Sequence, residues 1–179
     1  MKILHIAQMI GGLDVYIRNT IMYANNDFEY VIVHGDGDKS APIEKKHVTI
    51  KEYLIPLYRE LCIINDIKSV VQAIKIIKKE RPDVIHCHSA KGGVVGRIAG
   101  FFTGTKTFYT PHAFSYLSSE SKIKRFFYKT VEKLTRLKSY LLACSESEKQ
   151  LGINEVHYKN THAFVWNNAV PDANLLLNE

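Results

Sequence analysis

The fold of this chain is decided by residues 83–93, which read DVIHCHSAKGG. An apolar run breaks into a segment with paired glycines, which is typical of a buried strand that ends in a loop and leads into a helix. Residues 3–12, ILHIAQMIGG, repeat this pattern near the N-terminus. In an open parallel sheet, the loops at the carboxyl ends of the strands line the ligand crevice. We therefore expect five residues to converge on one cleft: Gly11, Gly12, His88, Ser89 and Lys91.

Strands and helices alternate along the rest of the chain. Apolar runs and turn residues predict further strands over 29–34, 47–55, 105–110, 140–144 and 161–166. Apolar positions at helical spacing predict helices over 12–25, 64–79, 93–102 and 122–138, and another from residue 146. This alternation predicts an α/β fold with a doubly wound, mainly parallel, Rossmann-like sheet.

The overall composition narrows the classes of protein. The chain has 179 residues, a formal charge of +6 and three cysteines. An odd number of cysteines without paired spacing indicates free thiols of a reducing compartment. No secretory signal and no bilayer-length apolar run is visible, so we expect a cytoplasmic protein whose membrane contact is peripheral. The positive charge favours anionic partners. Nucleic acid is not expected among them, because the basic residues lie on helices without interleaved exposed aromatics.

The glycine pair after the first strand points to a phosphate ligand. Gly11 and Gly12 let a ligand approach the backbone, and the N–H groups of the following helix suit a diphosphate. A plain structural turn is the alternative. The chain lacks both G-x-G-x-x-G and the P-loop motif, which disfavours NAD or FAD.

The run His86-Cys87-His88 raises the question of a metal. His86 and His88 share one face of a strand, whereas Cys87 points to the other. No second cluster supplies further ligands, so we predict that no metal is bound and no cofactor is required. We expect His88 to form hydrogen bonds in the cleft and His86 to be a satisfied core residue.

Two later strand ends carry polar residues. His112 follows the strand over 105–110, held by the preceding proline, and we expect it to face the same cleft; an ordinary surface loop is the alternative. Ser145 and Glu148 form an S-x-x-E capping box after the strand over 140–144. The Gly/Asp cluster at 35–38 is interpreted as a turn in solvent, since the spacing of a calcium loop is missing.

The helix over 122–138 is strongly amphipathic. Its apolar positions include Ile123, Phe126, Phe127, Leu134 and Leu137. Beside them runs a basic stripe made of Lys122, Arg125, Lys129, Lys133 and Arg136. Such a helix can lie on an anionic membrane surface. The alternative is a helix whose apolar stripe covers the sheet and whose basic flank is solvated.

Taken together, these motifs resemble the N-terminal half of a GT-B glycosyltransferase of family 4, the group that builds capsular polysaccharide and O-antigen units. The resemblance covers nearly the whole chain and rests on the order and spacing of its segments. These are KILHI with GG at 2–6 and 11–12, PDVIHCHS with KGG and GR at 82–97, YTPHAF at 109–114, Y with VEKL at 128–134, and LLACSESE at 141–148. The sequence departs from the family at Leu13-Asp14, Ala113, Ser139 and Ala169.

The resemblance implies a retaining transferase that moves a sugar from a nucleotide-sugar donor to a saccharide on a polyprenyl diphosphate carrier. By analogy, Gly11 and Gly12 would face the donor diphosphate and His112 the transferred sugar. The acceptor side would be lined by His88, Ser89, Lys91 and Phe114, and the basic helix would dock on the inner membrane face. Residues 1–166 would form the N-terminal domain and 167–179 would begin the linker to an absent second domain, so that the isolated chain is inactive. A non-catalytic module that binds an anionic or lipid-linked ligand is the alternative.

Overall fold

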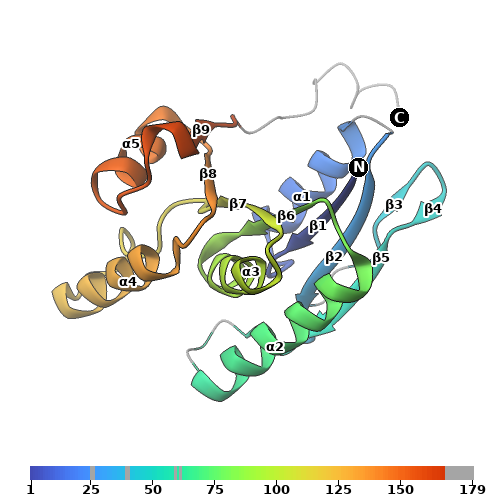
Figure 1. Ribbon diagram of the computed structural model, residues 1–179, viewed down its shortest axis with the longest axis horizontal. Helices are drawn as coiled ribbons and strands as arrows, with labels where there is room; N and C mark the ends of the chain where they lie inside the picture. The colour runs from blue at the N-terminus through green and yellow to red at the C-terminus, as the bar shows by residue number, and fades with distance from the viewer. Residues whose placement is uncertain (25–26, 39–40, 59, 61, 168–179) are drawn as a thin grey trace.

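The computed structural model describes residues 1–24, 27–38, 41–58, 60 and 62–167. Within these ranges, seven strands form one sheet in the order β5-β2-β1-β6-β7-β8-β9, and every neighbouring pair is parallel (Figure 1). The strands are β1 (Lys2–Ile6), β2 (Glu29–Gly35), β5 (Lys51–Ile55), β6 (Val84–His88), β7 (Lys106–Thr110), β8 (Tyr140–Ala143) and β9 (Ala163–Val165). A small antiparallel hairpin, β3 (Glu44–Lys45) and β4 (Val48–Thr49), precedes β5.

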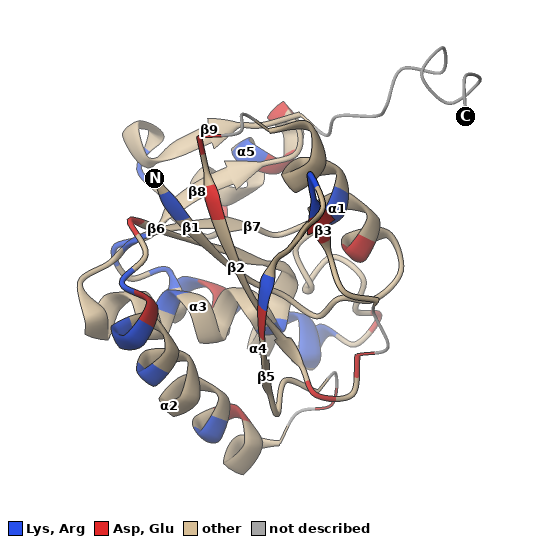
Figure 2. Ribbon diagram, turned by 90° about the vertical axis from the view of Figure 1, so that its right-hand side faces the viewer, with Lys and Arg blue, Asp and Glu red and all other residues tan. Residues whose placement is uncertain are grey.

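Helices connect the strands of the sheet, except that the hairpin lies between β2 and β5. They are α1 (Gly12–Tyr23), α2 (Ile63–Glu80), α3 (Ser89–Thr103), α4 (Lys122–Thr135) and α5 (Glu146–Asn154), with a short 3-10 turn at Asn160–His162. The strand order reverses direction at β1, so right-handed crossovers place α1 on one face and α2 and α3 on the other. Figures 1 and 2 show this division, with α3 lying between α2 and α4.

The predicted α/β class and the parallel sheet are confirmed, with three local corrections. The strand expected over 47–55 is divided between the hairpin and β5. The helix expected from residue 93 begins at Ser89, directly after β6, because Ser89 has the φ of 54° that turns the chain at once. The helix expected to end at residue 138 ends at Thr135. The expected linker lies outside the described residues from 168 onward.

Each face of the sheet has its own apolar core. The larger cluster includes Leu4, Ile6, Ile85 and Tyr109 and lies on the side of α2 and α3. The smaller one gathers Ile17 and Ile21 of α1 against strand residues, and its members are Ala7, Met9, Ile17, Ile21, Tyr30, Ile32, Ile43 and Ile50. In the described part of the chain, no helix is long and apolar enough to span a bilayer.

Glycines allow α3 to pack closely on the sheet. A Cβ at Gly92 would lie 2.6 Å from the carbonyl oxygen of Ile6, and a Cβ at Gly93 would lie 2.2 Å from the ring of Tyr109. The first contact is with backbone, which cannot rotate away. Gly92 therefore fixes how near the start of α3 lies to the end of β1, which brings two loops of the carboxyl edge together.

A buried ion pair joins α3 to α4. Arg97 is 1% exposed, and its Nη2 lies 2.9 Å from Glu132 Oε2. The other carboxylate oxygen accepts a hydrogen bond from the Tyr109 hydroxyl at 2.9 Å. The guanidinium also lies 4.0 Å from the centre of the Tyr109 ring and 3.4 Å, through Nη1, from the Tyr158 hydroxyl. This network attaches α4 to the rest of the fold through polar contacts.

Candidate functional site

The crevice of a doubly wound sheet forms where the strand order reverses. Here that point lies between β1 and β6, because β1 is paired with β2 on one side and β6 on the other. Gly11 and Gly12 follow β1 and are exposed. Gly11 is the N-cap of α1, with a φ of 58° and no side-chain hydrogen bond. A Cβ added at Gly11 or at Gly12 would meet nothing within 4 Å. The start of α1 thus leaves open space beside unsatisfied helix N–H groups, the geometry that accommodates an anion.

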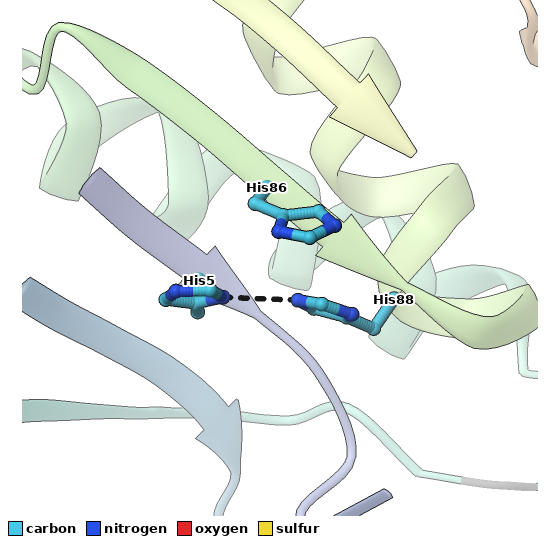
Figure 3. Close-up of side chains that lie close together, drawn as sticks. All are labelled: His5, His86 and His88. Atoms are coloured by element: carbon cyan, nitrogen blue, oxygen red, sulfur yellow. Dashed lines mark hydrogen bonds between the residues drawn. The ribbon is translucent and has the colours of Figure 1, made fainter. Parts of the chain in front are cut away.

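Histidines from three strand ends form a hydrogen-bonded chain beside this point. His5 Nδ1 lies 2.9 Å from His88 Nε2, and His88 Nδ1 lies 3.2 Å from His112 Nε2. His112 Nδ1 is then 3.6 Å from the sulfur of Cys144. Figure 3 shows His5 and His88 pointing toward one another from adjacent strands, with His86 next to them. The predicted convergence of His88 and His112 is therefore observed, and the chain extends inward to His5.

Burial keeps these imidazoles neutral. It lowers the pKa of His5 and that of His112 to about 4, and it lowers the pKa of His86 and of His88 well below the usual value. A neutral imidazole has one donor nitrogen and one acceptor nitrogen. The histidines of this hydrogen-bonded row must therefore all donate toward the same end of the row. Whichever direction is taken, both nitrogens of His112 have a neighbour, and one must be released to bond a ligand.

The same cluster bears on the question of a metal. Nitrogens of His5, His86 and His88 lie within 4.8 Å of one another, so β1 supplies the third imidazole that the sequence did not reveal. Cys87 lies on the opposite face, in the larger core cluster. Hydrogen bonds occupy His86 Nε2, 2.8 Å from Thr110 Oγ1, and both nitrogens of His88, which bond His5 and His112, whereas the buried His5 Nε2 has no partner among the described residues. A metal would have to displace those shared protons, and we retain the prediction that none is required.

The loop that carries His112 is held by a carboxylate. His112 and Ala113 have φ values of 52° and 74°, a left-handed conformation that favours glycine. Glu148 Oε1 accepts a hydrogen bond from the Ala113 N–H and Glu148 Oε2 one from the Cys144 N–H, both at 2.7 Å. Ser145 caps α5 as predicted, accepting from the Glu148 N–H. The Glu148 side chain, however, joins the loops after β7 and β8 instead of closing the capping box.

Sequence reasoning missed two further residues of this edge. Asp38 Oδ2 accepts from the N–H groups of Met9 at 2.6 Å and Gly35 at 3.0 Å, so it ties the loop after β1 to the loop after β2. The turn at 35–38 is thus a structural clamp as well as a solvent loop. Tyr16 of α1 contacts the His112 ring edge-on at 4.6 Å between centroids.

The residues predicted for the acceptor side differ in how accessible they are to a ligand. Phe114 is fully buried and packs on Tyr116, so it belongs to the core and offers no surface to an acceptor. His88 is also fully buried and contacts other histidines. Ser89 and Lys91 lie in the first turn of α3, and Lys91 bonds Asp66 of α2.

Lys91 instead borders an apolar groove of about 1410 Å³ between α2, α3 and α4. Its walls are formed by Ile63, Ile67, Val70, Val71, Val94, Val95, Ile98, Phe127, Tyr128 and Val131. Its polar end lies at the carboxyl edge of the sheet and contains Asp66, Lys91, Ser115, Ser118, Ser119, Glu120, Ser121 and Lys124.

The apolar stripe of α4 does not cover the sheet, which corrects one of the two predicted alternatives. Ile123 is 82% exposed, Phe126 74% and Leu134 71%, whereas the residue that α4 buries most is Glu132. Among the basic stripe, Lys122 and Arg125 are exposed, and Lys129 pairs with Glu155 at 2.9 Å. Figure 2 shows basic residues along α2 and α4.

Residues 10–174 match the family described as Glycosyltransferase Family 4. The chain therefore belongs to glycosyltransferase family 4. Over 112 residues it is 32% identical to the UDP-Gal:alpha-D-GlcNAc-diphosphoundecaprenol alpha-1,3-galactosyltransferase of Escherichia coli, covering 61% of this chain and 29% of that protein. Over 102 residues it is 25% identical to the capsular polysaccharide biosynthesis glycosyltransferase CapM of Staphylococcus aureus, covering 57% of this chain and 26% of that protein.

Solved structures agree on the fold. Anabaena HepE in complex with UDP superposes with a TM-score of 0.67 at 18% identity, covering 98% of this chain and 46% of that one. The UDP-GlcNAc 2-epimerase of Methanocaldococcus jannaschii gives a TM-score of 0.61 at 17% identity, covering 94% and 46%. The chain spans less than half of these proteins and of the curated relatives it matches.

Proposed function

We propose that this chain is the N-terminal, acceptor-side half of a retaining glycosyltransferase. It would transfer a sugar from a nucleotide-sugar donor to a lipid-linked saccharide in surface polysaccharide synthesis. The single observation that carries this is the ring contact of Tyr16, in the second turn of α1, with His112 of the loop after β7, 4.6 Å between centroids. Three comparisons support the same assignment. The chain belongs to glycosyltransferase family 4, the name of the Escherichia coli relative includes a UDP-sugar and diphosphoundecaprenol, and HepE was solved with UDP bound.

Within this proposal, each feature of the crevice has a role. The Gly11-Gly12 segment would face the donor diphosphate, because small residues and free N–H groups let phosphate oxygens approach the backbone. His112 would bond a hydroxyl of the transferred sugar, with its tautomer set by His88. The donor would also be held by a second α/β domain, so the chain by itself would not turn over.

The test is a transfer assay with the chain alone and joined to its second domain. We expect turnover of a nucleotide sugar onto a polyprenyl-diphosphate-linked saccharide only with both halves, and an NMR spectrum of the product in which the anomeric configuration of the donor is kept. Replacing His112 by Ala should reduce kcat about 10- to 100-fold, the worth of one buried polar contact. His47→Ala, an exposed histidine of the hairpin, is the matched control. Transfer by the chain alone would contradict the division of roles, and an inverted product would refute the retaining mechanism.

We further propose that α4 docks the domain on an anionic membrane surface. Its exposed apolar side chains lie beside the exposed cations Lys122 and Arg125, the pattern of an interfacial helix. Sedimentation with anionic vesicles should exceed that with neutral vesicles. Each neutralising substitution, Lys122→Gln or Arg125→Gln, should weaken binding about fivefold, whereas Lys75→Gln on α2 should not. Equal sedimentation with both kinds of vesicle would refute this docking.

A further inference from the structure

The groove between α2, α3 and α4 is an apolar surface that the crevice does not use. Ile63, Ile67 and Phe127 on its walls are 78%, 59% and 49% exposed. Apolar area of this extent outside a core marks a binding surface. The groove lies on the opposite face of the sheet from α1, yet its polar end reaches the carboxyl edge, where α2 and α3 begin.

The groove differs from end to end. The polar end has four serines, and its charges nearly balance, because Lys91 is paired with Asp66, and Glu120 and Lys124, which also line it, have opposite charges. From there the walls are apolar apart from Glu132, whose carboxylate is already bonded by Arg97 and Tyr109. These walls come from side chains of helices, whose backbone groups are already bonded within each helix. An extended peptide would find no partners there for its own N–H and C=O groups. A hydrocarbon chain needs none.

The groove also adjoins the surface of α4. Phe127 lines it, while the neighbouring Phe126 lies outside it and is more exposed. A hydrocarbon chain leaving the groove beside Phe127 would therefore meet the exposed apolar stripe of α4. This arrangement connects the carboxyl edge, which needs a polar reacting group, to a surface suited to lipid.

We propose that the groove binds the isoprenoid chain of the lipid-linked acceptor and so delivers its polar head to the carboxyl edge. This rests on the proposed function for the identity of the lipid, but binding by itself involves no transfer. The near-neutral polar end implies that the hydrocarbon chain supplies most of the affinity and that the diphosphate lies beyond the groove, toward the crevice. The occupant is therefore a polyprenyl chain and not a phosphate group alone.

The experiment measures binding of farnesyl diphosphate to the chain by calorimetry, with geranyl diphosphate and inorganic diphosphate for comparison. We expect saturable binding that weakens as the isoprenoid shortens and is absent for inorganic diphosphate. Phe127→Asp should weaken binding tenfold or more, because it places a charge on an apolar wall, whereas Phe126→Asp should change it by less than about twofold. Both positions are on the surface of α4, and circular dichroism verifies that both variants are folded.

Several results would overturn the proposal. Equal affinity for inorganic diphosphate would indicate a phosphate site, and equal affinity for dodecyl phosphate would indicate a site for any alkyl chain. Equal loss in the two phenylalanine variants would indicate non-specific adsorption to α4. A dimer that Phe127→Asp dissociates in sedimentation velocity would assign the groove to a second copy. If farnesyl diphosphate binds as expected while the two-domain protein transfers no sugar, the isoprenoid site is supported and the proposed function is refuted. If sugar is transferred but farnesyl diphosphate does not bind, only the isoprenoid site is refuted.

Discussion

Removing the charge of Arg97 should destabilise the chain far more than breaking an ion pair at its surface. Arg97 and Glu132 are 1% and 2% exposed, and the guanidinium and carboxylate are 2.9 Å apart. In Arg97→Met the carboxylate would remain buried without its counter-ion, which costs about 3–5 kcal/mol of unfolding free energy. The total unfolding free energy of a single domain is about 5–15 kcal/mol. The variant should therefore lose a large share of its stability.

The assay is urea unfolding followed by circular dichroism. With a slope of about 2 kcal/mol per molar urea, the midpoint should fall by about 2 M. Lys129→Met is the matched control, because Lys129 and Glu155 are also 2.9 Å apart but partly exposed, and such pairs contribute about 0–1 kcal/mol.

A double variant, Arg97→Met with Glu132→Leu, should recover part of the loss, since no isolated charge stays buried, although the buried Tyr109 hydroxyl then lacks its acceptor. The reasoning would be refuted if Arg97→Met lost less than about 1 kcal/mol, or if the double variant were less stable than the single one.

Three further predictions concern the elements that hold the carboxyl edge. Gly92→Ala should lower the unfolding free energy by about 1–3 kcal/mol in urea titrations, because its Cβ would meet the backbone of Ile6, whereas Gly12→Ala, with open space around it, should leave stability unchanged or higher. Glu148→Gln should lower the unfolding free energy by about 1–3 kcal/mol in thermal unfolding, because its amide nitrogen must face a backbone N–H. Glu146→Gln, exposed on the same helix, should change it by less than about 0.5 kcal/mol. The unfolding free energy should fall as the pH drops from 6.5 toward 4. The pKa of His5 is about 4 in the folded chain and 6.5 in the unfolded chain, so the unfolded chain binds the proton first. This difference should lower the unfolding free energy by about 3 kcal/mol at pH 4. His5→Phe should remove the part of that loss due to His5, while His86, His88 and His112, whose pKa values burial also lowers, keep the remainder; an unchanged profile would contradict the assignment.

Much of the fold could be predicted because the periodicity of the strands and helices is local. The runs over 2–7, 29–34 and 84–88 alternate with helices, and that pattern has few alternatives to a parallel sheet. The start of α3 was predicted four residues too late, because glycines are poor helix formers and their helical state here is imposed by close packing on β1.

The candidate site was less predictable. That loops after β1, β6 and β7 share one edge follows from topology, and the structure shows His88 bonded to His112, with Tyr16 of α1 against the His112 ring. Burial does not follow from topology: Phe114 belongs to the core, and Lys91 faces a different groove, since side-chain direction depends on neighbours distant in sequence. The exposure of the apolar stripe on α4 was equally hidden, because periodicity reports that a helix has an apolar face and not what covers it.

The two bonds accepted by Glu148 have an evolutionary consequence. Its partners are main-chain N–H groups, which every residue except proline possesses. The side chain at position 144 can therefore change while the two loops remain joined, whereas position 148 has no such freedom and position 113, with its φ of 74°, favours glycine. Variation among descendants of this sequence should accumulate at position 144, which lets the surroundings of His112 diverge without loosening the edge on which the site is built.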